Sequence, residues 1–268
     1  MPDDALEGNV HLKNIPLLAG KSYKLHLMLL LAASNMNSEA FAKFKSILES
    51  VVYYTVIDKI ATNITERTFA LWCRDVRNIV TAEDLDCFVK NTIIPTVNDW
   101  KLDNKSNFLR LGLNSMQQYR IKFILGKITA YVDALKLGKT TVEDLTTYTE
   151  TAVEIEHIMP QACTDKGLYG MNEEEFSVYI NRLGNLTLLE NTINRSIQND
   201  VYANKATYYK QSKFYITSSI SELVNLGQDT AINRTNSLLS SWPDWNKQAI
   251  EERQEMFYRL SEMIWELR

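Results

Sequence analysis

The chain has 268 residues, of which 45% are apolar and 23% are charged. These proportions exclude an extended disordered chain, and the length fits two domains better than one. Five prolines and nine glycines are few for a sandwich or barrel with many tight turns, so the composition favours helices. The net charge of −4 excludes a strongly basic protein that coats nucleic acid, so any DNA-binding surface must be local.

Cysteine usage and the apolar runs indicate where such a chain would reside. Cys73, Cys87 and Cys163 are widely spaced and match neither a disulfide framework nor a zinc motif. The longest apolar run, residues 25–33, is far shorter than the roughly 20 residues that a membrane span needs. The acidic N-terminus lacks the order of a signal peptide. We therefore expect a cytoplasmic protein that does not associate with membranes.

The first half of the chain has the periodicity of amphipathic helices. Between residues 23 and 138, apolar side chains recur at intervals of three and four, which places one apolar stripe on each of several helices. Pro95 predicts that one helix ends or kinks near Ile94, and Gly138 predicts the end of the last helix. Helix starts are predicted where a hydroxyl residue precedes early carboxylates, at Ser38, Thr65 and Thr81.

A change of composition predicts a domain boundary. Threonines crowd residues 140–151, which disfavours a long helix and suits a linker or the approach to a strand. We therefore predict a helical bundle over 1–145 and a second domain over 146–268, in a mainly α chain. The second domain is expected to hold a strand at 153–158, a helix near 173–181, a turn and strand at 183–189, a helix from 192 and helices at the C-terminus.

Charge is unevenly distributed within the second domain. Residues 143–175 carry nine acidic side chains and one lysine, whereas residues 181–213 carry five basic and two acidic ones. A stretch that can hold a cation therefore adjoins one that can hold phosphate. The alternative is that both are solvated faces of opposite sign, which is the commoner meaning of such a pattern.

Two short stretches combine the residue types that phosphodiester hydrolysis needs. The first reads Glu-Ile-Glu-His-Ile-Met-Pro-Gln over 154–161, and the second reads Asn-Arg-Leu-Gly-Asn-Leu-Thr-Leu-Leu-Glu-Asn-Thr-Ile-Asn-Arg over 181–195. Hydrolysis needs a base that deprotonates water and a divalent cation that neutralises charge on the phosphate oxygens. His157 is the candidate base, because an ordinary histidine has a pKa of about 6.5.

The neighbouring acidic and amide side chains supply the other parts of such a site. Asn194 offers a neutral oxygen ligand for Mg²⁺, and Asn185 can fix the tautomer of the imidazole through a hydrogen bond. Glu156 is a candidate metal ligand, although in a regular strand it would point away from His157, so a twist or bulge is needed. Glu154 is a second candidate ligand, or a surface carboxylate.

These stretches, followed by Lys205, Tyr208 and Ser212, resemble the HNH-type C-terminal domain of GmrSD-like type IV restriction endonucleases. The spacing is also similar to that of the HNH domain of RNA-guided CRISPR nucleases. The resemblance covers about 154–212, and the last helical segment is similar too. It implies a small ββα-metal module that follows the N-terminal bundle and is completed by C-terminal helices.

The resemblance also implies roles for individual residues. Glu156 and Asn194 would hold one Mg²⁺ or Mn²⁺, His157 would activate water, and Asn185 would support His157. The implied substrate is foreign or modified DNA, such as phage DNA, and the implied purpose is defence. No DGQQR-like motif of the usual N-terminal nucleotide-binding domain is found, so we expect that domain as a separate subunit or as a missing part of a longer protein.

Basic residues near the motif are candidates for contacts with DNA phosphates. The alternative for the whole chain is a non-catalytic DNA-binding or interaction scaffold with a degenerate HNH-like site. A nuclease would need a metal ion and would lose cutting without His157, whereas a scaffold would bind DNA equally well in the presence of a chelator. The candidate DNA contacts are Arg182, Arg195, Lys205 and Lys210.

Overall fold

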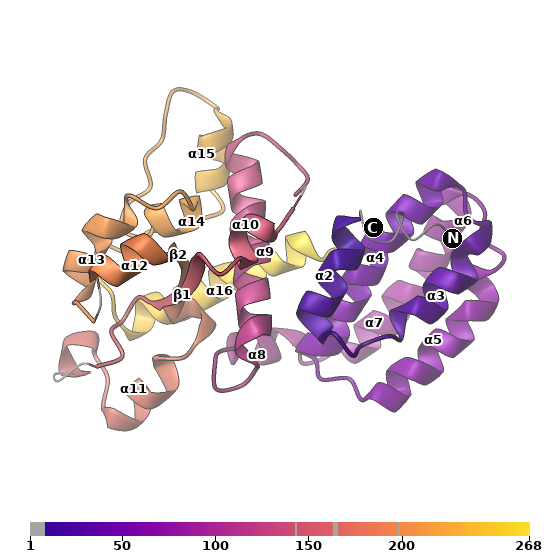
Figure 1. The fold of residues 1–268 in the computed structure, drawn as a ribbon, viewed down its shortest axis with the longest axis horizontal. Coiled ribbons are helices and arrows are strands. Elements are labelled where there is room, and N and C mark those ends of the chain that lie inside the picture. The colour runs from indigo at the N-terminus through magenta and orange to yellow at the C-terminus, as the bar shows by residue number, and fades with distance from the viewer. Residues whose placement is uncertain (1–8, 143, 163–165, 198) are drawn as a thin grey trace. The chain divides into compact units, whose positions relative to one another are not determined.

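The protein is mainly helical, as predicted, with one pair of antiparallel strands in the part of the chain that the structure describes (Figure 1). Among the described helices, none is long and apolar enough to cross a membrane. Cys73 and Cys87 are free thiols, and Cys163 lies outside the described residues. The structure is a computed structural model and describes residues 9–142, 144–162, 166–197 and 199–268.

The chain forms two compact units, one of Met1–Phe108 with Trp265–Arg268 and the other of Leu109–Ile264. The predicted boundary at residue 145 lies inside the second unit. The observed division falls before the long helix α9 (Gln118–Lys136), because α9 packs against the second strand and against four later helices. The crowded threonines hold the short helix α10 (Thr146–Thr149) instead of a linker between units.

The first unit is a bundle of helices. α2 packs on α4, α3 packs on α5, and the apolar stripe of α4 is buried along most of its length. The described elements of this unit are α2 (Val10–Ala19), α3 (His26–Ala32), the 3₁₀ turn Ala33–Asn35, α4 (Ser38–Ile57), α5 (Thr62–Val76), α6 (Ala82–Phe88), the π-helical turn Val89–Ile93, α7 (Ile94–Trp100) and α8 (Asn104–Leu109), whose last residue belongs to the second unit.

Helix starts and stops follow local chemistry with two differences from the prediction. Thr81 caps α6 in a reciprocal capping box with Asp84, as its sequence predicts. Asn37 caps α4, one residue before the expected Ser38, because its side-chain oxygen reaches the backbone N–H of Ala40. The start predicted at Thr65 is wrong, because α5 already begins at Thr62.

Pro95 and Gly138 act near their predicted positions. Pro95 lies in the first turn of α7, where its missing N–H is tolerated, and one π-helical turn joins α6 to α7 just before it. The predicted kink near Ile94 therefore takes the form of this widened turn. Gly138 follows α9 with a φ of 72°, a left-handed conformation that ends the helix.

The second unit contains the predicted motif. Its strands and helices lie close to the predicted segments, with boundaries that shift by a few residues. The described elements after α10 are β1 (Val153–His157), the 3₁₀ turn Lys166–Tyr169, α11 (Glu173–Tyr179), the 3₁₀ turn Leu183–Asn185, β2 (Leu186–Glu190), α12 (Asn191–Ile197), α13 (Tyr202–Tyr209), α14 (Tyr215–Ser218), α15 (Ala231–Asn236) and α16 (Lys247–Ile264).

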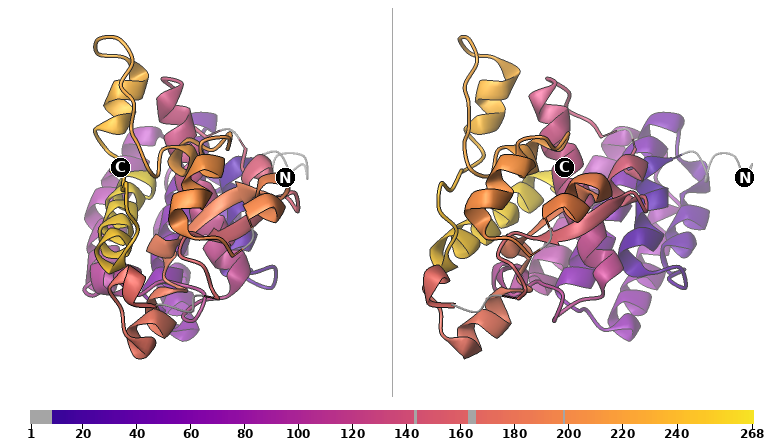
Figure 2. Two further views of the ribbon diagram at one scale, coloured as in Figure 1. Left: turned by 90° about the vertical axis from the view of Figure 1, so that its left-hand side faces the viewer. Right: turned by 60° about the vertical axis from the view of Figure 1, so that its left-hand side comes forward.

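The two strands and α12 form the frame on which the motif residues lie. β1 and β2 are antiparallel, with Glu154 opposite Leu189 and His157 opposite Leu186. α12 follows β2 without a loop and contacts both strands (Figures 1 and 2). Asn194 therefore lies in the middle of a helix that is anchored beside β1.

The C-terminal helix fixes the turn that leads into β2. The buried guanidinium of Arg253 on α16 donates to the carbonyl oxygens of Gly184 and Leu186, at 2.9 and 2.7 Å. A Cβ atom at Gly184 would collide with the carbonyl oxygen of Ile250, so only glycine permits this close approach. The Gly-Asn turn of the motif is therefore held by α16, which lies some 70 residues later in the sequence.

Candidate functional site

The acidic residue next to the candidate base lies in a buried ion pair. Glu156 is only 7% exposed, and its Oε1 accepts hydrogen bonds from Lys205 Nζ at 2.6 Å and from Tyr209 Oη at 3.0 Å. Burial and the nearby Glu156 raise the pKa of Tyr209, so its hydroxyl stays a donor. The ammonium of Lys205 also donates to the carbonyl oxygen of His157 at 2.7 Å. This cluster neutralises Glu156 and fixes the end of β1.

The second acidic residue of the strand meets the predicted closing residue of the motif. Asn194 Nδ2 donates to Glu154 Oε2 at 2.7 Å, and both side chains are half-buried. Lys122 on α9 lies near Glu154. Burial lowers the pKa of Lys122, and the negative charge of Glu154 opposes this shift. Lys122 Nζ donates to the carbonyl oxygen of Glu150 at 2.8 Å. Glu154 and Asn194 thus form a polar pair with an adjacent cation.

His157 is held by two amide side chains. Its Nε2 lies 3.3 Å from Asn181 Oδ1 and 3.2 Å from Gln161 Nε2. The amide of Asn181 is oriented by a bond from its Nδ2 to Asn114 Oδ1 at 3.0 Å. The Asn181 oxygen can only accept and the Gln161 amide nitrogen can only donate, so the two contacts require opposite states of His157 Nε2. Because the bond to Asn114 fixes the amide of Asn181, we take the tautomer with hydrogen on Nε2, which leaves Nδ1 to accept a proton.

The surroundings favour the neutral form of this imidazole. Burial is the main cause that lowers the pKa of His157, and the positive charge of Lys205 lowers it further. The hydrogen bond that His157 donates to Asn181 Oδ1 raises the pKa. A histidine with a lowered pKa is unprotonated at neutral pH, which is the state that a general base needs.

Asn185 does not contact the imidazole, contrary to the expectation from its spacing. The side chain is fully buried, and its Oδ1 accepts from the Met159 backbone N–H and from Trp245 Nε1, each at 2.9 Å. Its Nδ2 donates to the carbonyl oxygen of Ile180 at 2.8 Å. Asn185 therefore links the segment after His157 to the segment before Arg182 through hydrogen bonds to backbone atoms.

The structure brings some predicted site residues together and keeps others apart. Glu154 and Glu156 lie on one face of the hairpin, and alternation along β1 places His157 on the other face. Among the described residues, no hydrogen bond joins the side chain of His157 to Glu154, Glu156 or Asn194. Nor do the described residues include a group of three or more His, Cys, Asp or Glu side chains that could hold a metal.

The four candidate DNA contacts fall into different environments. Lys205 is 1% exposed and paired with Glu156, so its ammonium does not face solvent, and this removes it from the candidate phosphate contacts. Lys210 is exposed but pairs with Glu222 at 3.1 Å. Arg195 is exposed on α12. The guanidinium of Arg182 lies over the ring of Tyr179, 4.1 Å from its centroid.

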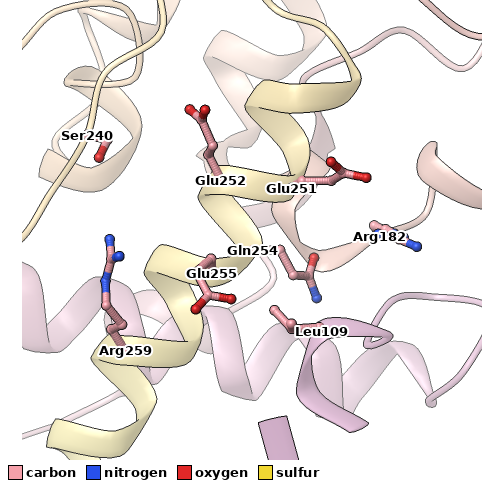
Figure 3. A pocket seen from close by; sticks show the side chains of 8 residues that line it. All are labelled: Leu109, Arg182, Ser240, Glu251, Glu252, Gln254, Glu255 and Arg259. Atoms are coloured by element: carbon pink, nitrogen blue, oxygen red, sulfur yellow. The ribbon is translucent and has the colours of Figure 1, made fainter. Parts of the chain in front are cut away.

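Two hollows lie near this region, and they differ in charge. The larger, about 540 Å³, is lined by three carboxylates and by two arginines, Arg182 and Arg259, and Figure 3 shows Glu251, Glu252 and Glu255 projecting from α16. The three carboxylates outnumber the two arginines, so this hollow suits a DNA phosphate less well than a purely basic one does. The smaller, about 210 Å³, is lined by Arg110, Asn181 and other polar residues. It therefore shares Asn181 with the surroundings of His157.

Sequence reasoning missed Asn181 and Lys122 as members of this region. Asn181 directly precedes Arg182 at the start of the second motif stretch, and this adjacency was the available signal. Its contact with His157 spans 24 residues, and spacing alone does not predict such a contact. Lys122 belongs to α9, which the sequence pattern assigned to the N-terminal bundle.

The comparisons with known proteins agree with this geometry. The family model of the C-terminal domain of GmrSD restriction endonucleases matches residues 97–260, which include both strands, α12 and α13. This chain belongs to that family. Membership supports a nuclease enzyme that forms part of a restriction endonuclease, whose substrate is DNA. No curated protein matches the chain closely enough to add a further relative.

Proposed function

We propose that this chain is the nuclease part of a metal-dependent, HNH-type DNA endonuclease that hydrolyses phosphodiester bonds of foreign or modified DNA in restriction or antiviral defence. The observation that carries this proposal is the hydrogen bond of 2.7 Å between Glu154 and Asn194. It joins the strand that ends in His157 to the helix that closes the motif, across 40 residues of sequence. Family membership over 97–260 supports the same function.

Glu154 and Asn194 are the residues that suit a hard divalent cation such as Mg²⁺ or Mn²⁺. Both carry oxygen donors, and both are half-buried, so water can complete the coordination. Asn194 presents its NH₂ group to Glu154, and a half-turn of the amide would present Oδ1 instead. Lys205 already neutralises Glu156, so we assign the carboxylate ligand to Glu154 and give Glu156 a structural role. The cation would neutralise charge on the phosphate oxygens.

His157 is the proposed general base. Its lowered pKa keeps it neutral, and its contact with Asn181 through Nε2 leaves Nδ1 to take a proton from water. The base would act on the attacking water, whereas the cation would neutralise charge on the phosphate oxygens, so His157 does not need to touch Glu154 or Asn194. Asn185 contributes by holding the backbone of Met159, two residues after His157.

The proposal includes a partner that selects the target. The resemblance to GmrSD-like enzymes implies an N-terminal nucleotide-binding domain or subunit, and we expect it to carry recognition and nucleotide dependence. Nicking by the present chain alone should then be weak and unspecific. A single site serves one strand at a time, so nicks should precede double-strand breaks.

A supercoiled-plasmid nicking assay with Mg²⁺, Mn²⁺ or EDTA tests the proposal. Wild type should nick with metal and not with EDTA, and His157→Ala should lower the rate by about 100- to 10,000-fold, as expected for a missing general base. His157 is half-buried, so thermal unfolding should remain close to that of wild type. Thr192→Ala, an exposed position on α12, serves as the control and should nick normally.

One observation favours a second candidate, a DNA-binding scaffold without catalysis. The acid that precedes His157 is neutralised by Lys205, and the described residues show no bond from His157 to Asn194. A scaffold would bind the plasmid with or without EDTA and would never nick it. A folded wild-type chain that binds DNA and does not nick it with either metal, even after the partner domain is added, would replace the nuclease proposal with this one.

A further inference from the structure

The smaller hollow beside His157 is built by a close approach of two loops. Leu113 N–H donates to the carbonyl oxygen of Asn181 at 2.9 Å, and Leu183 N–H donates to that of Leu111 at 2.8 Å. These bonds flank an isolated antiparallel bridge between Gly112 and Arg182. A Cβ atom at Gly112 would collide with the Asn181 carbonyl oxygen, so the loops can approach only with glycine there.

The residues that line this hollow carry two positive charges and no negative one. The lining residues are two arginines, three residues with amide or hydroxyl side chains, and two apolar residues: Arg110, Arg182, Asn114, Ser115, Asn181, Gly112 and Val178. Within the described chain, neither arginine forms an ion pair with a carboxylate. A guanidinium that lacks an acidic partner remains available to bind a phosphate in bidentate geometry.

The hollow is linked to the proposed base by a short chain of side chains. Asn114 accepts from Asn181, and Asn181 in turn faces the imidazole of His157. Asn181 lines the hollow, so an anion bound there would lie one side chain away from His157. The larger neighbouring hollow combines two arginines with three carboxylates, whereas the smaller one is lined by two arginines and by no acidic residue, so the smaller one is the more favourable position for an anion.

We infer that this hollow, lined by Arg110, Asn114, Ser115, Asn181 and Arg182, is a subsite for a phosphate of the DNA backbone that flanks the one being cut. The inference rests on the proposed function. It assigns the two arginines the task of positioning the strand, because phosphate contacts fix register without reading sequence. Arg110 belongs to no motif in the sequence, and its role follows only from the bridge between the two loops.

Binding of a short DNA duplex in EDTA, measured by fluorescence anisotropy over a range of salt concentrations, tests this subsite apart from cleavage. Each lost phosphate contact lowers the slope of log affinity against log salt by about 0.9. Arg110→Ala and Arg182→Ala should each bind more weakly at low salt. The ratio of wild-type to variant affinity should fall by about three- to fourfold between 50 and 200 mM salt. Arg110→Lys keeps the charge and should keep the slope.

Arg234→Ala is the matched control, because it removes one exposed arginine from the same unit. Arg234 lies on α15, which packs near the C-terminal end of α9, whereas the hollow lies just before its N-terminus. A helix of 19 residues separates these two places by about 28 Å. Thermal unfolding of each variant checks its fold, because Arg182 also stacks on Tyr179.

The outcomes separate this inference from the proposed function. If wild type binds the duplex and the Arg110 and Arg182 variants match Arg234→Ala in affinity and slope, the subsite is overturned and the proposed function stands. An equal loss in all three variants would indicate a general charge effect and would also overturn the subsite. If wild type does not bind DNA at any salt concentration, the proposed function fails together with the subsite.

Discussion

Two regions that share strand β1 handle charge in opposite ways. Around Glu156, a lysine, a tyrosine and the end of the strand form a buried cluster in which the carboxylate charge is neutralised inside the protein. Around Glu154, the carboxylate is half-buried and its partner is the neutral amide of Asn194. Glu154 and Glu156 are two residues apart on one face. Glu156 pairs directly with Lys205, whereas Lys122 near Glu154 donates to the Glu150 carbonyl oxygen, so Glu154 retains a charge that an added cation can neutralise.

The two carboxylates therefore have different roles, one in constraining the structure and the other in binding ligands. A buried ion pair contributes little net stability over an apolar pair, but removing one partner leaves a costly isolated charge. The Glu156–Lys205 pair therefore constrains the structure, and Lys205 extends this constraint to His157 through its backbone carbonyl. Glu154 and Asn194 carry no such constraint and remain open to ligands.

The largest expected effect is the loss of stability when the buried pair is broken. Lys205→Met should lower the free energy of unfolding by about 3–5 kcal/mol, because it leaves Glu156 buried without a counter-charge. Denaturant unfolding measures this change. The double variant Lys205→Met with Glu156→Gln should recover a large part of the loss, since no uncompensated charge remains.

Lys210→Met is the matched control for that experiment. It removes the next lysine in the chain, whose ion pair with Glu222 is solvent-exposed, and should change stability by less than about 0.5 kcal/mol. Equal unfolding midpoints for Lys205→Met and Lys210→Met would mean that the buried cluster does not constrain the fold as described.

The next effect concerns the metal requirement of the two carboxylates. Glu154→Gln should raise the Mn²⁺ or Mg²⁺ concentration needed for half-maximal nicking by about tenfold or more, because a carboxylate ligand becomes a neutral amide. Stability should barely change, because glutamine can still accept the hydrogen bond from Asn194. Glu174→Gln, an exposed position on α11, is the control. An unchanged metal requirement in Glu154→Gln would return the ligand role to Glu156.

A smaller effect tests how His157 is held. Asn181→Ala should lower the plateau nicking rate by about tenfold, as for other residues that orient a functional group, with the metal requirement unchanged. The hydrogen bond from His157 to Asn181 Oδ1 raises the pKa of His157, so its loss should lower that pKa further. The acid limb of the pH–rate profile should then move to lower pH. A larger loss of activity in Gln161→Ala than in Asn181→Ala would favour the opposite tautomer.

The sequence predicted the frame of this site better than its contacts. Hydrophobic periodicity and turn residues are local features of the sequence. They therefore predicted the bounds of both strands and of the helix that carries Asn194 to within a few residues. Lys205 and Asn181 were not assigned their roles, because their partners lie 49 and 24 residues away. Alternation along a strand predicts which side chains share a face, but not which of them meets a lysine from another helix.

The same limit applies to the predicted boundary near residue 145. The threonines of 140–151 change the local composition, but α9 before them packs against β2 after them. The composition of a segment indicates its secondary-structure propensity. The compact unit to which a helix belongs depends instead on which other elements its apolar face packs against. The stripe of α9 meets β2 and α16, so this helix belongs with the motif.

A third carboxylate, that of Asp133, is half-buried and can be compared with those of Glu154 and Glu156. Asp133 on α9 accepts a hydrogen bond from the Tyr215 backbone N–H at 2.8 Å, and burial raises its pKa from 3.8 to about 6. The hydrogen bonds from the Tyr215 backbone and the Tyr148 side chain, and the charge of Lys136, only partly offset this shift. The folded protein therefore binds a proton that the unfolded chain has released between about pH 4 and 6. Stability from this group is present below pH 4 and is lost as pH rises through 6.

Asp133→Asn should consequently make the protein more stable at pH 7 by about 1 kcal/mol, because the amide oxygen keeps the bond from Tyr215 without a buried charge. We expect less than the roughly 3 kcal/mol that two pKa units represent, because the half-buried side chain is partly solvated. Unfolding midpoints from pH 4 to 7 measure the effect, and the variant should gain on wild type mainly above pH 5. A variant that loses stability at pH 7 would mean that the charge of Asp133 is needed in the fold, as that of Glu156 is.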